Sequence, residues 1–300
     1  MYRIAFDPIY CHPLPDGHRF PMAKYELLPE QLIREGTVEE SAFFAPDVLT
    51  EERILRTHDP IYWEKLKTGS LERREERKIG FPWSEQLVLR ERIICRGTAL
   101  NTEYAMKDGV SFNIAGGTHH AYTDRGEGFC LLNDIAIGAH HLIDNFQFER
   151  ILVIDLDVHQ GNGTAQIFQN EPRVFTFSIH GEKNYPLQKE HSDLDIGVPD
   201  GISDKDYLRL VDRHVKELID SFEPQFIFFQ SGVDILKTDK LGRLGVSISG
   251  CKDRDRIVFE TAHKNNIPVA VNMGGGYSER LTDIIEAHAN TYRMARQIFF

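Results

Sequence analysis

The sequence has few cysteines, no long apolar run and no internal repeat. Its 300 residues contain four cysteines, none in a C-x-x-C pair: Cys11, Cys95, Cys130 and Cys251. This spacing argues against a disulfide framework or a zinc ribbon and suits a reducing compartment. No apolar stretch approaches the length of a bilayer crossing, and the first residues, "MYRIAFDPIY", lack the pattern of a secretory signal. We therefore expect a cytoplasmic protein that does not enter membranes.

An excess of positive charge is also missing. The formal net charge of -11 at pH 7 disfavours nucleic-acid phosphate as a direct partner. An acidic surface weakly favours a cationic substrate through steering, although the same charge also serves ordinary solubility. No low-complexity tract or Ser/Gly-rich linker divides the chain, and 41% apolar residues are ample for a core. We predict a single domain over residues 1–300.

Helical patterns alternate with short β-rich runs, which is typical of an α/β protein with a mainly parallel central sheet. The predicted strands are 3–6, 110–115, 151–156, 174–179, 226–231 and 269–272. The predicted helices are 128–146, 203–222, 252–266 and 278–299. The first hundred residues read as helices and irregular loops, and we interpret the highly charged run 70–80 as a solvated helix or loop.

A polar cluster follows each of the longer predicted strands. These clusters are "GGTHH", "DLDVH", "SIH", "QSGVD" and "NMGGGY". Ligands of an open parallel sheet bind outside the carboxyl ends of its strands. The sequence therefore predicts a functional site at this edge of the sheet.

The cluster "DLDVH" has the residue types of a metal site. With a strand period of two, Asp155, Asp157 and His159 share one face. Carboxylate oxygen and imidazole nitrogen bind zinc, and a metal offsets the cost of burying these polar groups. The alternative to a metal site is an N-capping or salt-bridged strand end. Asp234, the last residue of the cluster "QSGVD" at the end of a neighbouring strand, is the candidate third ligand. Two carboxylates, one histidine and an open position describe a catalytic zinc site.

Two further clusters supply groups for amide hydrolysis. "GGTHH" contributes His119 and His120, and "NMGGGY" presents Tyr277 after three glycines. A metal activates water, a histidine moves protons, and a hydroxyl stabilises a developing oxyanion.

Together these motifs resemble the histone deacetylase-like zinc amidohydrolases of the arginase/deacetylase fold. The resemblance rests on "AGGTHHA", "GEGFCLLNDIAIG", "DLDVHQGNGT", "VFTFSIH", "GVDILKTDKLGRLGVS" and "MGGGY", in this order. It runs from about Ile4 to the last helix, and "HGEKNYP" and "HSDLDIGVPDG" look closest to the class IV-like, bacterial-type branch. The resemblance implies a single-domain, three-layer α/β/α fold with a mainly parallel sheet.

The resemblance also implies a role for individual residues. One Zn²⁺ per chain would be held by Asp157, His159 and Asp234. A structural K⁺ would lie beside it, held by Asp155, Ser178 and the backbone of Asp157, His159 and Ile179. His119 would be oriented by Asp155, His120 would be the general base and later the acid, and Tyr277 would donate to the substrate carbonyl.

The same resemblance implies an acyl-lysine tunnel, with Gly128 and Phe129 on one wall and Tyr185 on the opposite wall. Many relatives carry phenylalanine at the position of Tyr185. Asn162 stands where class I relatives have aspartate, and a neutral partner holds a charged histidine less strongly. Segments 11–24, 68–84 and 181–196 are expected to shape the tunnel rim.

The implied activity is hydrolysis of an acylated primary amine, most simply acetyl-lysine, by a metal-dependent deacetylase. An acetylpolyamine-type small-molecule amidohydrolase and a long-chain fatty-acyl-lysine deacylase are the alternatives. An arginase-like dinuclear manganese site needs more bridging carboxylates than Asp234 and Asp239 provide. A non-catalytic acyl-lysine binder is disfavoured because the tyrosine, the ligands and the histidines are all present. The sequence leaves the oligomeric state open.

Overall fold

The computed structural model describes residues 2–300, and within them eight strands form one parallel sheet. The order across the sheet is β2-β1-β3-β8-β7-β4-β5-β6, and every pair of neighbours is parallel. The strands are β1 (Ile4–Ala5), β2 (Phe43–Phe44), β3 (Val110–Asn113), β4 (Ile151–Asp155), β5 (Val174–Gly181), β6 (Leu194–Val198), β7 (Phe226–Gln230) and β8 (Val269–Asn272). The expected parallel α/β architecture is confirmed.

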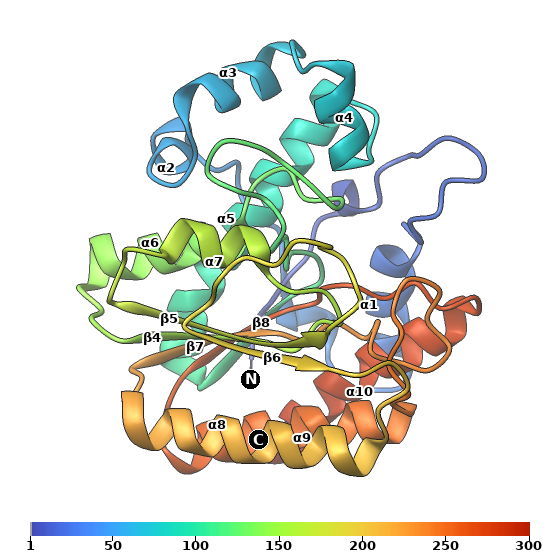
Figure 1. Ribbon diagram of the computed structural model, residues 1–300, viewed down its shortest axis with the longest axis vertical. Coiled ribbons are helices and arrows are strands. Elements are labelled where there is room, and N and C mark those ends of the chain that lie inside the picture. The colour runs from blue at the N-terminus through green and yellow to red at the C-terminus, as the bar shows by residue number, and fades with distance from the viewer. Residues whose placement is uncertain (1) are drawn as a thin grey trace.

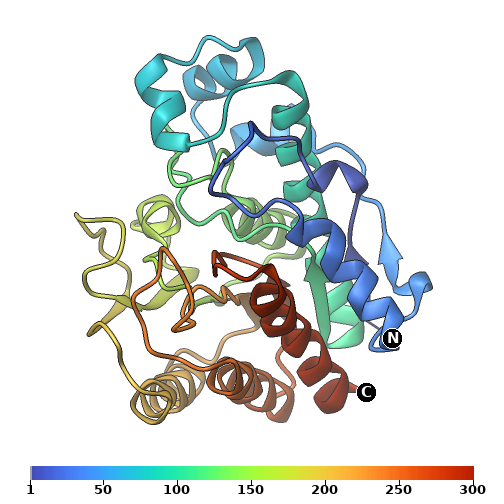
Figure 2. The same cartoon turned by 90° about the vertical axis from the view of Figure 1, so that its right-hand side faces the viewer.

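Helices cover both faces of the sheet, which makes the three layers. The helices are α1 (Lys24–Arg34), α2 (Glu51–Leu55), α3 (Pro60–Thr68), α4 (Arg73–Ile79), α5 (Glu85–Asp108), α6 (Asp134–Phe146), α7 (Asn162–Phe168), α8 (Asp204–Phe222), α9 (Ile248–Lys264) and α10 (Leu281–Phe299). Helices α5, α6 and α7 lie over one face, and α8, α9 and α10 lie over the other (Figure 1). Helices α2, α3 and α4 gather at the end of the molecule away from α8 and α9 (Figure 2).

The central strands are apolar because both of their faces are covered. Every residue of β3, β4, β7 and β8 is buried. On α8, the apolar residues Tyr207, Val211 and Val215 recur at helical spacing and are buried against this core. No helix among residues 2–300 combines the length and apolar character needed to cross a membrane.

The structure differs from the predicted elements at several places; α7 was not predicted, and α9 begins at Ile248, four residues before the predicted helix. Strands β2 and β6 were not predicted, because β2 has only two residues and the sequence of β6, "LDIGV", is interrupted by Asp195 and Gly197. The helix predicted from residue 128 begins only at Asp134, where the Asn133 side chain accepts a hydrogen bond from the amide of Ala136. Residues 128–133 instead form an irregular segment beside the sheet edge.

Candidate active site

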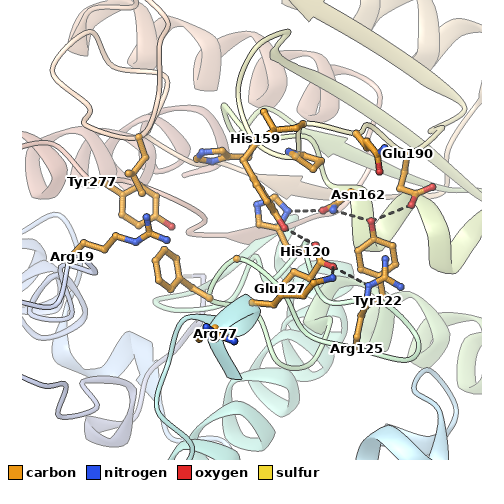
Figure 3. A pocket seen from close by; sticks show the side chains of 18 residues that line it. Arg19, Arg77, His120, Tyr122, Arg125, Glu127, His159, Asn162, Glu190 and Tyr277 are labelled. Atoms are coloured by element: carbon orange, nitrogen blue, oxygen red, sulfur yellow. Dashed lines mark hydrogen bonds and ion pairs between the residues drawn. The ribbon is translucent and has the colours of Figure 1, made fainter. Parts of the chain in front are cut away.

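The polar clusters that follow the central strands converge at the carboxyl edge of the sheet. His120, after β3, His159, after β4, and Tyr277, after β8, line the same cavity, which has a volume of about 920 Å³ (Figure 3). Segments far apart in the chain complete its walls. The parallel strands thus place these side chains around one space, as the sequence predicted.

The deepest part of this site is a group of three buried side chains that could hold a metal ion. Asp157, His159 and Asp234 each offer one ligand atom, and these atoms lie within 4.8 Å of one another. Nδ1 of His159 lies 3.0 Å from Oδ1 of Asp157 and 3.1 Å from Oδ2 of Asp234. Two carboxylates and one imidazole form a donor set that suits zinc with an open position.

The backbone fixes the two carboxylates of this group. Oδ2 of Asp157 accepts from the amide of Gly275 at 2.8 Å, and Oδ1 of Asp234 accepts from the amide of Val158 at 2.9 Å. A Cβ atom on Gly275 would collide with Oδ2 of Asp234, so only glycine allows this approach. Burial lowers the pKa of His159, but the two carboxylates outweigh it and raise this pKa to about 10. The buried carboxylates of Asp157 and Asp234 therefore stabilise a positive charge placed between them.

The two adjacent histidines have different environments. Nδ1 of His119 lies 2.6 Å from Oδ2 of Asp155. Burial lowers the pKa of His119, but the charges of Asp155 and Asp157 overcome it and raise this pKa to about 9. Burial holds the pKa of His120 well below its ordinary value, and the neighbouring His119 and His159 lower it further. One histidine is thus held charged and the other neutral.

A chain of hydrogen bonds sets the orientation of His120. Its Nδ1 lies 2.6 Å from Oδ1 of Asn162, and Nδ2 of Asn162 donates to the hydroxyl of Tyr122 at 2.9 Å. The hydroxyl of Tyr122 donates in turn to Oε1 of Glu190 at 3.1 Å (Figure 3). Because the amide nitrogen of Asn162 donates to Tyr122, its oxygen faces His120 and accepts a hydrogen bond from Nδ1–H. The other ring nitrogen, Nε2, is left as a base.

Tyr277 lies across the cavity from His120 (Figure 3). Its amide donates to Oδ2 of Asp239 at 2.6 Å, and Asp239 also accepts from the amides of Leu241 and Gly242. These bonds occupy the carboxylate of Asp239 and fix the turn that carries Tyr277. Burial raises the pKa of the Tyr277 hydroxyl well above its ordinary value, so this group stays a proton donor.

The predicted tunnel residues Gly128, Phe129 and Tyr185 all line the cavity. Phe129 has a φ of 68°, and its amide and that of Gly128 donate to carbonyls at the end of α4. A Cβ atom on Gly128 would lie 2.6 Å from Cδ2 of His120, so glycine is required there. The Tyr185 ring packs edge-on against His120, with 5.0 Å between the ring centroids. Its hydroxyl donates to Oε2 of Glu127 at 2.5 Å and is turned toward the rim.

Other candidates lie near the edge without lining the cavity. Ser178 pairs with Asp155 across β5 and β4, and Ile179 follows it as a buried residue. In the N-terminal segment 11–24, expected at the rim, His12 is buried and Nε2 of His18 lies 2.9 Å from the carbonyl of Gly80.

Some residues of the site carried no recognisable signal in the sequence. Tyr122, Glu127 and Glu190 hold the predicted residues in place but belong to no metal or catalytic pattern. Lys24 is fully buried beneath the site, where its Nζ donates to the carbonyl of Gly274 at 3.1 Å. Burial lowers its pKa to about 8, although nearby carboxylates oppose this shift. Only the folded chain brings these residues to the strand ends.

The fold and the edge site together define a parallel α/β protein of the arginase/deacetylase type. Two solved structures share this fold at a TM-score of 0.84 and 23% identity. One, described as an HDAC homologue complexed with SAHA, is matched over 99% of this chain and 84% of its own. The other, an HDAC homologue from Aquifex aeolicus, is matched over 98% and 84%.

Sequence comparison gives the family. Residues 18–292 match the histone deacetylase domain, and the chain belongs to the histone deacetylase family. An uncharacterized protein of Picosynechococcus sp. is 39% identical over 298 residues, covering 99% of both chains. Histone deacetylase 2 of Arabidopsis thaliana is 28% identical over 277 residues, covering 89% of this chain and 72% of its own. Membership in this family supports a deacetylase-type hydrolase.

Proposed function

We propose that this chain is a zinc-dependent deacylase that hydrolyses the amide of an acylated primary amine, most simply acetyl-lysine. The observation that carries the proposal is the convergence of the Asp157–His159–Asp234 group, a histidine pair and Tyr277 on one buried floor. We propose that residues 1–300 act as one catalytic domain. Its four free cysteines fit a reducing cytoplasm.

The donor set fits one zinc ion per chain, since three protein ligands leave a position open. When bound there, Zn²⁺ supplies a Lewis acid that polarises the amide carbonyl and favours the ionised form of water. A K⁺ ion beside it would use Asp155, Ser178 and the nearby backbone. The register of β4 and β5, which pairs Asp155 with Ser178, supports this second cation site.

The chain's own residues divide the proton transfers. Nε2 of His120 accepts the proton of the attacking water, since Nδ1 is engaged by Asn162. The same nitrogen then returns the proton to the leaving amine. His119, held charged by Asp155, stabilises negative charge that develops beside the metal group. The hydroxyl of Tyr277 donates to the carbonyl oxygen as it becomes an oxyanion.

Alternative activities differ in their support. The carboxylate of Asp239 accepts three backbone amides and is not free to bridge two manganese ions, which disfavours an arginase-like site. Acetylpolyamines and longer acyl-lysines are the remaining substrate classes for the same chemistry. A binder without turnover has no need of a tyrosine hydroxyl aimed into the cavity.

The test measures hydrolysis of an acetyl-lysine peptide before and after complete metal removal and zinc restoration. Activity should vanish with the metal and return with zinc. Tyr277→Phe should lower kcat by about 10²- to 10³-fold with little change in KM, because the hydroxyl acts on the transition state. Tyr104→Phe, on α5 away from the cavity, is the matched control and should leave kcat unchanged. Activity that persists without metal, or in Tyr277→Phe, would refute the mechanism.

A further inference from the structure

The mouth of the cavity is rich in positive charge, although the whole chain carries a net charge of -11. The charged side chains that line it are Arg19, Arg77, Lys78 and Arg125 on one hand and Glu127 and Glu190 on the other. They come from four separate parts of the chain, including α4, whose charged run the sequence indicated as a solvated helix or loop.

Two of the basic groups are balanced by neighbouring carboxylates. Arg125 lies 2.9 Å from Glu127 and 3.0 Å from Asp124, and Lys78 lies 3.2 Å from Glu127. Glu190 accepts a hydrogen bond from the hydroxyl of Tyr122. These contacts leave Glu190 as the one carboxylate of the mouth that no basic side chain pairs with, among residues 2–300.

The other two basic groups have no carboxylate within ion-pair distance among the residues that the structure describes. The guanidinium of Arg19 lies 4.9 Å from the ring centroid of Phe129. That of Arg77 donates through Nε to the carbonyl of Arg73, so its two terminal nitrogens are available. Figure 3 shows Arg19 and Arg77 on one side of the opening and Glu190 on the other.

The position of these two groups is fixed to the tunnel wall. The amides of Gly128 and Phe129 donate to the carbonyls of Lys78 and Ile79 at 3.0 and 2.7 Å, which ties the end of α4 to the wall residue. Arg19 stacks on that residue from the N-terminal segment. A substrate whose acylated amine passes Phe129 therefore has the rest of its structure beside two unpaired guanidinium groups.

We propose that the mouth selects substrates that carry a carboxylate next to the acylated amine, with Arg19 and Arg77 as the binding groups. A guanidinium binds a carboxylate through paired hydrogen bonds, whereas it repels an ammonium group. The inference rests on the proposed deacylase function and narrows its substrate class: acidic acyl-lysine sequences or small acylated amino acids are favoured, and cationic acetylpolyamines are rejected. It also reverses, for the mouth, the weak preference for cationic substrates that the net charge indicates.

The test compares matched substrates on the zinc-loaded protein. Acetyl-lysine peptides of one length carry aspartate, asparagine or lysine beside the modified residue, and Nα-capped acetyl-lysine is used as the free acid and as the amide. We expect kcat/KM to fall by about fivefold from aspartate to asparagine and again to lysine, chiefly through KM. The differences should shrink at about 1 M salt, where charges are screened within about 3 Å. Faster hydrolysis of the free acid than of the amide of Nα-capped acetyl-lysine would identify a small acylated amino acid as the source of the carboxylate.

Two variants and a control test the assignment. Arg19→Gln and Arg77→Gln should each reduce the aspartate-to-asparagine ratio, and the double variant should bring it close to one. Arg74→Gln removes the same charge from an exposed position of α4 outside the mouth and should keep the ratio. Equal rates for acidic and neutral substrates in both series, or faster hydrolysis of acetylspermidine than of the neutral peptide, overturn the proposal.

Failure of the proposed function gives a different result, namely that no substrate of the series is hydrolysed. The charge preference is then read from binding: fluorescence anisotropy of labelled peptides on Tyr277→Phe measures affinity without turnover. Tighter binding of the aspartate peptide, lost in the double variant, supports the mouth assignment. Equal binding of the three peptides refutes it.

Discussion

The floor and the mouth of the cavity are built in different ways. The floor consists of Asp157, His159, Asp234 and the two histidines after β3, which all lie at strand ends. Backbone amides donate hydrogen bonds to the carboxylates of Asp157 and Asp234. The mouth is formed by side chains from the N-terminal segment, α4, the segment 122–129 and the loop between β5 and β6, all of which lie outside the strands of the sheet. The floor therefore has the geometry that chemistry requires, whereas the mouth can change its charge without disturbing the sheet.

The largest expected effect comes from breaking the floor. Asp157→Asn keeps the shape and can still accept from Gly275, but it removes one charge from the metal group. We expect bound zinc to fall and kcat/KM to drop by at least about 10³-fold, since metal activation of water is lost. Metal content and peptide hydrolysis are measured on the same sample.

Asp253→Asn provides the control for this change. Asp253 pairs with Arg256 on the exposed side of α9, far from the strand ends. Its zinc content and activity should stay within about twofold of the unaltered protein, as for most surface substitutions. Retention of zinc and full activity in Asp157→Asn would contradict the assignment of the floor.

A smaller effect is expected from the support between floor and mouth. Nδ1 of buried His58 lies 2.9 Å from the carbonyl of Tyr122, and its Nε2 accepts from the amide of Asn133 at 3.0 Å. Burial lowers the pKa of His58 from 6.5 to about 4. The unfolded chain therefore binds a proton first as the pH falls, so stability is complete above about pH 6.5 and is lost as the pH falls through 4.

Because of His58 alone, the free energy of unfolding should decrease by about 3 kcal/mol as the pH is lowered from 6.5 to 4. Urea unfolding at several pH values measures the loss. In His58→Gln, whose side-chain oxygen can still accept from Asn133, the loss over this interval should be smaller by about that amount. An unchanged pH dependence in the variant would show that His58 is not the group that titrates.

The smallest of these effects tests whether the mouth acts on the floor. Tyr122→Phe removes the hydroxyl that links Asn162 to Glu190, so the partner of His120 is held less firmly. We expect kcat to fall by about five- to tenfold with little change in KM, which corresponds to one net hydrogen bond. Glu190→Gln keeps an acceptor for the hydroxyl and should lose less. Equal kcat in Tyr122→Phe and the unaltered protein would mean that the two regions work independently.

The sequence predicted the sheet and the meeting of the strand-end clusters because both depend on local pattern. Alternation of apolar strands with helices gives the parallel order, and the polar residues then share an edge. The irregular segment at 128–133 was predicted as helix, since its apolar spacing gives no sign of the positive φ at Phe129. The hydrogen bond of Glu190 could not be predicted, because it depends on packing against Tyr122, which lies 68 residues away in the chain.

The sheet order has a consequence for how the protein is made. Strand β8 is the last strand of the chain, yet it lies between β3 and β7. Within residues 2–300 it is the only strand whose ladders join the β2-β1-β3 part of the sheet to the β7-β4-β5-β6 part. Until Asn272 has left the ribosome, the two parts share no ladder. Tyr277 follows five residues later, so the proposed oxyanion donor emerges almost together with the strand that joins them. On the proposed mechanism, a growing chain therefore cannot hydrolyse an amide before Tyr277 has been synthesised.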